Sequence, residues 1–338
     1  MDTRIPLVLK EISGYGNQRV RQLLDVYSRK PVALDELFPW IKETIGSKNL
    51  KLRIPESDEV HQAIERAMKR LDQSAEHGVE LVTWLDPLYP DRLRHIPNAP
   101  VYYFYKGNYD CIRRDLGVAI IGTREVSEYG KKIARRLGYL FGDEGFTVFS
   151  GLAIGCDQLA HEGCLEAKGS TVAIMPCGLD MVVPESNASL AERIISQEGC
   201  LLSEYPIGMK PAKNTYVERD RLQSGFSRGI LVVETDVEGG TMHTVGFAEK
   251  QGRQVACYDH QEKYLEEHKT KGNQMLIREG RALPVKDKES LTGYMEKLRS
   301  NDKNMNKQTS KQPISEEHHP VQLELGGAGV KKTGRGNI

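Results

Sequence analysis

The chain has 338 residues, of which 39% are hydrophobic, and this is enough for a substantial core. Its 47 lysines and arginines balance 47 aspartates and glutamates, so a nucleic-acid partner would have to be bound by a local basic patch. The six cysteines are scattered without a C-x-x-C pair, and neither a zinc site nor a disulfide framework is indicated. The apolar runs are too short for a signal peptide or a spanning helix, so we expect a globular, cytoplasmic protein with no metal, cofactor or membrane partner.

Residues 1–81 are expected to form a small helical domain of the SAM or helix-hairpin-helix type. Helical periodicity is present in "VRQLLDVYS" and "VHQAIERAMKRLDQSAEHG". In "EISGYGNQRVRQLL", Gly14 and Gly16 lead directly into a helix, where backbone N–H groups could approach a phosphate. A tight helix-helix turn that serves stability uses the same glycines, and this second interpretation is favoured.

Two segments flank the main domain. Residues 82–116 are rich in proline and aromatic residues and predict an extended connector with a short strand that packs on a sheet. Residues 300–338 are polar and poor in large apolar side chains, so they predict a disordered tail.

Residues 117–299 predict a doubly wound α/β domain of the Rossmann type with a mostly parallel sheet. The short runs "VAIIG", "FTVFSG", "STVAIMP", "GCLLSEY", "GILVVET" and "RQVACYD" are almost continuously apolar, as strands buried on both faces are. Helical segments separate them, and "YGKKIARRLGYLFGDEG" carries one apolar stripe. Alternating strands and helices are typical of this fold class.

Three of these strands are followed by glycine-containing turns that lead into helices. In a parallel sheet such turns lie at one edge, and their backbone amides can face an anion. Each motif alone is also compatible with an ordinary strand-to-helix turn. The candidate residues are Gly122, Thr123, Arg124 and Ser127 after the first strand, Ser150 and Gly151 after the second, and Gly239, Gly240 and Thr241 after the fifth.

The segment 203–225 interleaves cations and aromatic residues. Such a mixture suits phosphate binding combined with stacking of bases, although a charge run is more often a solvated surface and Glu218 and Asp220 lie within this one. The candidates are Lys213, Tyr216, Arg219 and Arg221.

In order and spacing, these motifs resemble the DNA-processing protein A (DprA/Smf) family. The resemblance runs from "YPDRLRHIPNAPVYYFYKGN" through "AIIGTREVSEYG", "SGLAIGCDQLAH", "YVERDRLQSG" and "EGGTMHT". It implies a non-catalytic protein that binds single-stranded DNA, protects it and loads a RecA-type recombinase onto it during natural transformation. It also implies a homodimer, a phosphate-binding Arg124, and a DNA pocket lined by Lys213, Tyr216, Arg219 and Arg221.

The chain departs from the family pattern at defined places. Tyr216 and Asp220 stand where the family has phenylalanine and asparagine, and "ACYDH" replaces a strand end that normally finishes in Pro-Gly. The winged-helix-like C-terminal domain of many members is not expected here. Asp220 adds a negative charge beside the expected phosphate site.

The sequence bears on three other functions. A LOG-like nucleotide phosphoribohydrolase would need a glutamate where Thr244 stands, unless Glu234 or Glu238 replaces it. A sensor for a small nucleotide in the same crevice stays open. A dinucleotide-dependent oxidoreductase is disfavoured, because no G-x-G-x-x-G follows the first strand.

Overall fold

The computed structural model describes residues 2–26, 33–114 and 116–300, and these belong to one compact unit that ends at Ser300. The predicted disordered tail, residues 300–338, therefore lies outside the described residues except for Ser300. The strands are β1 (Glu80–Thr83), β2 (Tyr102–Gly107), β3 (Gly117–Ile121), β4 (Thr147–Ser150), β5 (Thr171–Met175), β6 (Cys200–Ser203), β7 (Gly229–Val232), β8 (Gln254–Tyr258) and β9 (Leu283–Val285). The helices are α1 (Ile5–Glu11), α2 (Asn17–Val26), α3 (Leu37–Ser47), α4 (Ser57–Glu76), α5 (Asp91–Arg94), α6 (Asp110–Arg113), α7 (Glu128–Asp143), α8 (Cys156–Glu166), α9 (Ala188–Ser196), α10 (Lys213–Phe226), α11 (Thr241–Lys250), α12 (Lys271–Arg278) and α13 (Lys288–Ser300).

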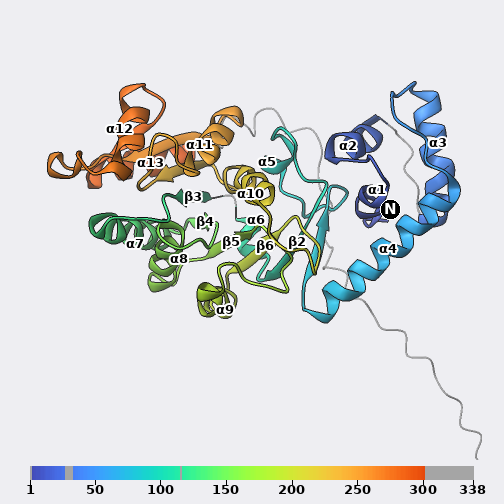
Figure 1. Cartoon of the computed structure of the whole chain (residues 1–338), viewed down its shortest axis with the longest axis horizontal. Helices are drawn as coiled ribbons and strands as arrows, with labels where there is room; N and C mark the ends of the chain where they lie inside the picture. Colours follow the sequence, from blue (N-terminus) through green and yellow to red (C-terminus); the bar gives the residue numbers. More distant parts are fainter. Residues whose placement is uncertain (1, 27–32, 115, 301–338) are drawn as a thin grey trace, which may run out of the picture. The chain divides into compact units, whose positions relative to one another are not determined.

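Within the described residues, the strands form one sheet in the order β1-β2-β6-β5-β4-β3-β7-β8-β9 (Figure 1). From β6 to β9 all neighbours are parallel, and the six strands predicted from the sequence are β3 to β8. The chain builds outward from β3 in one direction through β6 and then in the other from β7. The strand order thus reverses between β3 and β7, which is where α/β sheets usually bind ligands. The predicted fold class is confirmed.

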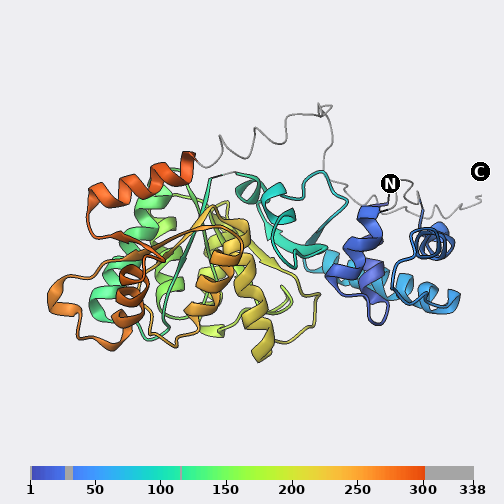
Figure 2. The same ribbon diagram turned by 90° about the horizontal axis from the view of Figure 1, so that it is seen from above.

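Both faces of the sheet are buried, which explains the continuous apolar runs. In β3, Val118 and Ile120 pack in one cluster with Phe141 of α7, whereas Ala119 and Ile121 pack in another with Phe226 of α10. Figures 1 and 2 show α7 and α8 on one side of the sheet and α10 and α11 on the other. A strand between two helical layers has no solvent face, so period-two alternation is absent.

The segment 82–116 is more than a connector. It holds most of the hairpin in which β1 pairs antiparallel with β2, and β2 pairs antiparallel with β6, so both strands extend the main sheet. The sequence prediction of an extended connector with one short strand missed β1 and its part in the sheet. Four-residue β1 is too short to give a clear periodic signal.

The expected N-terminal helices are present as α1 to α4, and the turn between α1 and α2 follows the stability interpretation. Gly14 has φ of +82°, and its carbonyl oxygen accepts a hydrogen bond from Arg19 at 2.6 Å. Tyr15 is buried and donates to the carbonyl oxygen of Arg53 at 2.5 Å. A separate domain ending near residue 81 stays a prediction, because the compact unit includes these helices.

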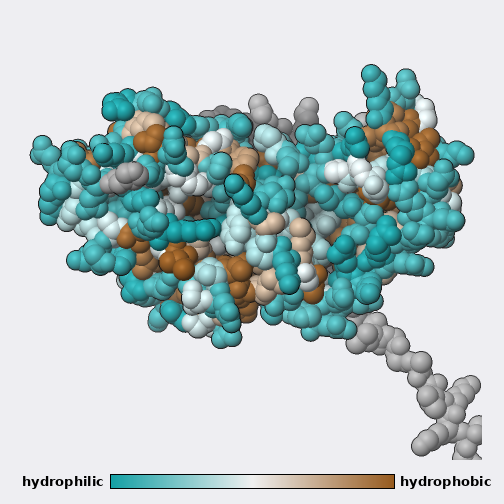
Figure 3. All heavy atoms as spheres, in the orientation of Figure 1, coloured by the Kyte–Doolittle hydropathy of each residue, from teal (hydrophilic) through white to brown (hydrophobic). Residues whose placement is uncertain are grey.

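The surface is mostly polar. Figure 3 shows a largely hydrophilic face with small apolar patches, and the large apolar side chains that are exposed are Ile54, Ile154, Met209 and Val237. Among the described residues, no helix is both long enough and apolar enough to cross a membrane.

Candidate functional site

The turns after β3, β4 and β7 interlock at the carboxyl edge of the sheet. Thr123 N donates to the carbonyl oxygen of Glu234 at 2.8 Å, and the carbonyl oxygen of Thr123 accepts from Cys156 N at 3.2 Å. A Cβ atom on Gly122 would lie 2.4 Å from Cys156 Sγ, so this close approach requires glycine. Gly122 and Thr123 therefore join the three turns, and the amide of Thr123 is taken by the chain itself.

The start of α7 is already occupied by an internal carboxylate. Glu234 is fully buried, and its two oxygens accept from Ser127 N at 2.9 Å and Ser127 Oγ at 2.6 Å. His260 Nε2 lies 3.5 Å from the same carboxylate. Burial raises the pKa of Glu234, but His260 and Ser127 outweigh it and leave this pKa below its ordinary value. Ser127 thus has a partner within the chain, and its contact with an external phosphate stays a prediction.

The residues predicted after β4 are buried at the carboxyl edge of the sheet. Ser150 Oγ donates to the carbonyl oxygen of Ile120 at 2.7 Å, and Gly151 N donates to Asp157 Oδ2 at 3.0 Å. The Arg219 guanidinium lies directly on Gly151, since a Cβ atom there would be 1.5 Å from Arg219 Nη1. These residues are brought together as expected, but their polar groups are committed to one another.

Arg219 is 4% exposed, and its guanidinium is held in place by the carbonyl oxygen of Ile174 and by the carboxylate of Asp220. Burial raises the pKa of Asp157 and of Asp220, and the positive charge of Arg219 lowers both. Burial outweighs the charge, so both pKa values stay above their ordinary values. Burial is the main cause for Asp220 and raises its pKa to about 6. Asp220 also lies within electrostatic reach of His243 and Arg124. No motif in the sequence pointed to His243, which lies on α11 two positions after Thr241.

Arg221 does not reach this crevice. Its guanidinium donates to Glu204 Oε2 at 2.5 Å and to the carbonyl oxygens of Asn98 and Glu218. Arg219 and Arg221 are two positions apart on α10, so they lie on different faces of the helix. Arg221 therefore has partners within the chain on the opposite side of α10, and its expected contact with DNA stays a prediction.

The remaining candidates are open to solvent. Arg124 is exposed, and its guanidinium carbon lies 5.3 Å from the ring centroid of Tyr216. Lys213 is exposed at the first position of α10. Gly240 is the N-cap of α11 and has open space beside it, and the amides of Met242 and His243 donate to the carbonyl oxygens of Gly239 and Gly240 at 2.9 and 3.0 Å. A cation held over an aromatic ring suits a phosphate with an adjacent planar base.

The geometry also bears on the hydrolase alternative. Glu234 is fully buried and committed to Ser127, so its carboxylate is not presented to a ribose in the crevice. Glu238 is exposed on the β7-α11 loop. Glu234 is therefore a poor candidate to replace the catalytic glutamate that a hydrolase would need where Thr244 stands.

One structural residue of the site gave no signal in the sequence. Asn273 of α12 accepts from Thr235 N at 3.0 Å and donates to the carbonyl oxygens of Val233 and Tyr258 at 2.9 and 3.0 Å. It joins the ends of β7 and β8 and so positions the loop that leads to Gly239. A lone asparagine after a glycine looks like a turn residue, and only its burial shows this role.

The family model and the relatives found by sequence point to one protein family. A family model described as DNA recombination-mediator protein A matches residues 80–296. Protein Smf of Synechocystis is 32% identical over 253 residues, which are 74% of this chain and 60% of that protein. DNA processing protein DprA of Bacillus subtilis is 31% identical over 59% of this chain and 66% of that protein. The chain thus spans about two thirds or less of the length of these relatives.

Two solved structures are similar. The X-ray structure of DNA processing protein A from Streptococcus pneumoniae has a TM-score of 0.69 and 27% identity, covering 87% of this chain and 98% of that one. The second structure describes the single-stranded DNA binding mode of DNA processing protein A from Helicobacter pylori. Its TM-score is 0.57 with 24% identity, over 66% of this chain and 97% of that one, so it supports the fold.

Proposed function

Because this chain belongs to the DNA recombination-mediator protein A family, we propose that it binds single-stranded DNA at the carboxyl edge of its sheet, protects the strand and presents it to a RecA-type recombinase. The observation that carries the proposal is the exposed Arg124 held over Tyr216, close to the strand-order reversal between β3 and β7. The proposed contacts are Arg124, Lys213, Tyr216, Gly239, Gly240 and Thr241. The proposal includes a homodimer and no catalytic step.

The chemistry of the site supports a strand more than a single nucleotide. Arg124 and Lys213 are separate exposed cations on two elements, so they suit successive phosphates of a backbone. The Tyr216 ring offers a sequence-tolerant surface for a base. The buried carboxylates of Glu234 and Asp157 already accept from amides of two turns. At the start of α11 the amides of Met242 and His243 donate to the carbonyl oxygens of Gly239 and Gly240, which leaves the amides of Gly240 and Thr241 for an external anion.

Arg124→Ala and Lys213→Ala are each expected to weaken binding of a labelled dT oligomer about fivefold to tenfold, since each removes one cation that would pair with a phosphate. The slope of log affinity against log salt concentration should become shallower by about 0.7 for each phosphate that is no longer neutralised. Fluorescence anisotropy at two salt concentrations measures both quantities. Arg193→Ala is the matched control, because Arg193 is exposed on α9 and forms no ion pair with the described residues.

Thermal unfolding should be unchanged in these variants, since both side chains are exposed. Unchanged DNA binding in the Arg124→Ala/Lys213→Ala double variant would place the DNA site elsewhere. The recombinase step is tested by filament assembly of a purified RecA-type protein on a strand already covered by single-strand binding protein. No acceleration by the wild-type protein would contradict that part of the proposal.

DNA binding is also expected to strengthen as the pH falls from about 7.5 to 5.5. Asp220 has a pKa of about 6, raised mainly by burial, so its carboxylate is mostly ionised at the upper pH and mostly neutral at the lower. The groups that face it are Arg219, Asp157, His243 and Arg124. Asp220→Asn should bind about fivefold more tightly at pH 7.5, because removing one nearby like charge is worth about 1 kcal/mol.

Anisotropy titrations across this pH range check the prediction. A pH profile of Asp220→Asn that is identical to that of the wild type would show that Asp220 does not affect the bound strand.

A further inference from the structure

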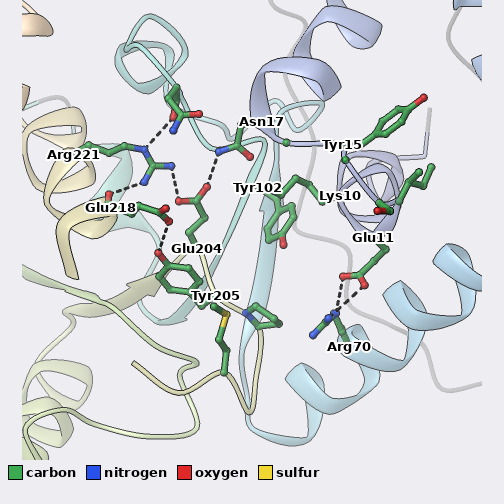
Figure 4. Close-up of a pocket in the computed structure, with 17 residues that line it drawn as sticks. Lys10, Glu11, Tyr15, Asn17, Arg70, Tyr102, Glu204, Tyr205, Glu218 and Arg221 are labelled. Carbon is green, nitrogen blue, oxygen red and sulfur yellow. Dashed lines mark hydrogen bonds and ion pairs between the residues drawn. The ribbon is translucent and has the colours of Figure 1, made fainter. Parts of the chain in front are cut away.

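A cavity of about 700 Å³ lies on the other side of α10 from the DNA crevice. It is lined by the α1-α2 turn, by Arg70 of α4, by Tyr102 of β2 and by the loop after β6, and Glu218 and Arg221 of α10 complete it (Figure 4). This volume is within the range of sites that hold a nucleotide-sized ligand. None of its lining residues belongs to the exposed contacts proposed for DNA.

Two buried side chains in this cavity have unused hydrogen-bonding groups. Asn17 is 8% exposed, and its Nδ2 donates to Glu204 Oε1 at 2.8 Å. That bond defines the amide orientation, because the flipped amide would place two oxygens together. Asn17 Oδ1 is therefore an acceptor, and it has no partner among the described residues.

Tyr102 supplies the matching donor. It is 6% exposed, and its hydroxyl forms no hydrogen bond with the described part of the chain. Burial, with Glu204 and Glu11 nearby, raises the pKa of Tyr102, so the hydroxyl stays protonated. Figure 4 shows Asn17, Glu204 and Tyr102 among the side chains around the cavity.

The three groups define a hydrogen-bonding edge. Asn17 Oδ1 accepts, and each Glu204 oxygen is bonded once and can accept a second time. Tyr102 donates. The guanine edge is complementary, because N1–H and the 2-amino group are two donors and O6 is an acceptor, whereas adenine and cytosine carry one donor group there.

The rest of the cavity suits the other parts of such a ligand. Lys10 lines the cavity and forms no ion pair with the described residues, so it can meet a phosphate. Met209 is 39% exposed at the cavity, and its polarizable sulfur suits contact with a planar ring.

We propose that this cavity is a guanine-binding site, in which Asn17 and Glu204 accept from the base, Tyr102 donates to O6 and Lys10 faces the phosphate. Glu204 also holds Arg221 of α10, the helix that carries Lys213 and Tyr216. A bound guanine thus contacts the residues that hold α10 in place. The base can come from a free mononucleotide or from a guanosine of a bound strand.

Calorimetric titration of the full chain with GMP, IMP and AMP tests the proposal without DNA. GMP should bind, and IMP, which lacks the 2-amino donor, should bind about fivefold more weakly, the equivalent of one hydrogen bond. Tyr102→Phe should weaken GMP binding about fivefold as well. This variant keeps the ring and breaks no bond within the protein, so it should fold normally.

Tyr105→Phe is the matched control, because Tyr105 is on the same strand but its hydroxyl bonds to Glu80 outside the cavity. Titrations with dT15 and with the same oligomer carrying one central dG distinguish the two sources of the base. Either GMP binding or a gain from dG supports the site, provided that Tyr102→Phe reduces it. The proposal is overturned if neither ligand shows an effect of Tyr102→Phe or if AMP binds as well as GMP.

The GMP titration also distinguishes the guanine site from the proposed DNA site. Arg124→Ala should leave the GMP titration unchanged, since Arg124 does not line the cavity. The proposed DNA binding and the proposed guanine binding can therefore fail independently of each other.

Discussion

Replacing Arg221 with methionine is expected to lower the free energy of unfolding by about 3 kcal/mol, because removing one partner of a buried ion pair leaves the other charge uncompensated. The Arg221 and Glu204 side chains are 5% and 11% exposed, and they are joined at 2.5 Å. Arg221 also donates to the carbonyl oxygens of Asn98 and Glu218, which lose a partner in the variant. Urea denaturation followed by circular dichroism measures the change.

Two further variants give this prediction its controls. Arg193→Met makes the same substitution at an exposed position and should change stability by less than about 0.5 kcal/mol. Arg221→Met combined with Glu204→Gln should recover part of the stability, because the orphaned charge is removed. If Arg221→Met unfolds like the wild type but binds DNA poorly, the arginine serves the strand directly and its structural assignment is wrong.

Glu234→Ala is expected to cost about 3 kcal/mol of stability and also to weaken DNA binding. The variant leaves Ser127 N and Oγ without their acceptor and opens a cavity at a fully buried position. The carboxylate also stabilises the start of α7 through the helix dipole. Because Ser127 anchors the turn that carries Arg124, its release should disorder the guanidinium and lower affinity.

Glu238→Ala is the matched control for Glu234→Ala. Glu238 is exposed on the same loop, so its removal should leave stability unchanged within about 0.5 kcal/mol. Chemical denaturation and anisotropy titration of both variants provide the comparison. Equal stability of the two variants would show that the Glu234 carboxylate does not support the α7 turn.

These residues suggest how the chain limits its anion sites. Glu234 accepts from Ser127 N at the start of α7, and Asp157 accepts from the amide of Gly151. Carboxylates of the chain itself thus occupy two of the three turns that were predicted to bind an anion. The amides of Gly240 and Thr241 and the exposed side chains of Arg124 and Lys213 remain for an external phosphate. The internal carboxylates thus confine the proposed strand to one side of the crevice.

Much of the fold could be predicted from the sequence. The runs that became β3 to β8 were recognised because a strand between two helical layers is apolar at every position, as Val118 to Ile121 are. The order of the motifs was enough to indicate the family, which the family model over residues 80–296 confirms. The short strands β1 and β9 escaped detection, because three or four residues are too few to establish a period.

The set of candidate site residues was only partly resolved by the sequence. Residue type and the position after a strand brought Arg124, Ser127, Arg219 and Arg221 together as one set of anion contacts. Tertiary structure divided that set, since the direction of each side chain depends on helix phase and on partners distant in the chain. Ser127 meets Glu234, 107 positions away, and Arg221 reaches Asn98, 123 positions away.

The sequence by itself therefore determined the α/β class, the edge at which the turns gather and the family, because local patterns and their order carry that information. Tertiary structure alone decided which amides and guanidinium groups stay free and which are consumed internally. It also joined Asn17, Tyr102 and Glu204 around one cavity, although no motif links them. Such choices depend on burial and on long-range hydrogen bonds, which arise only when distant segments meet.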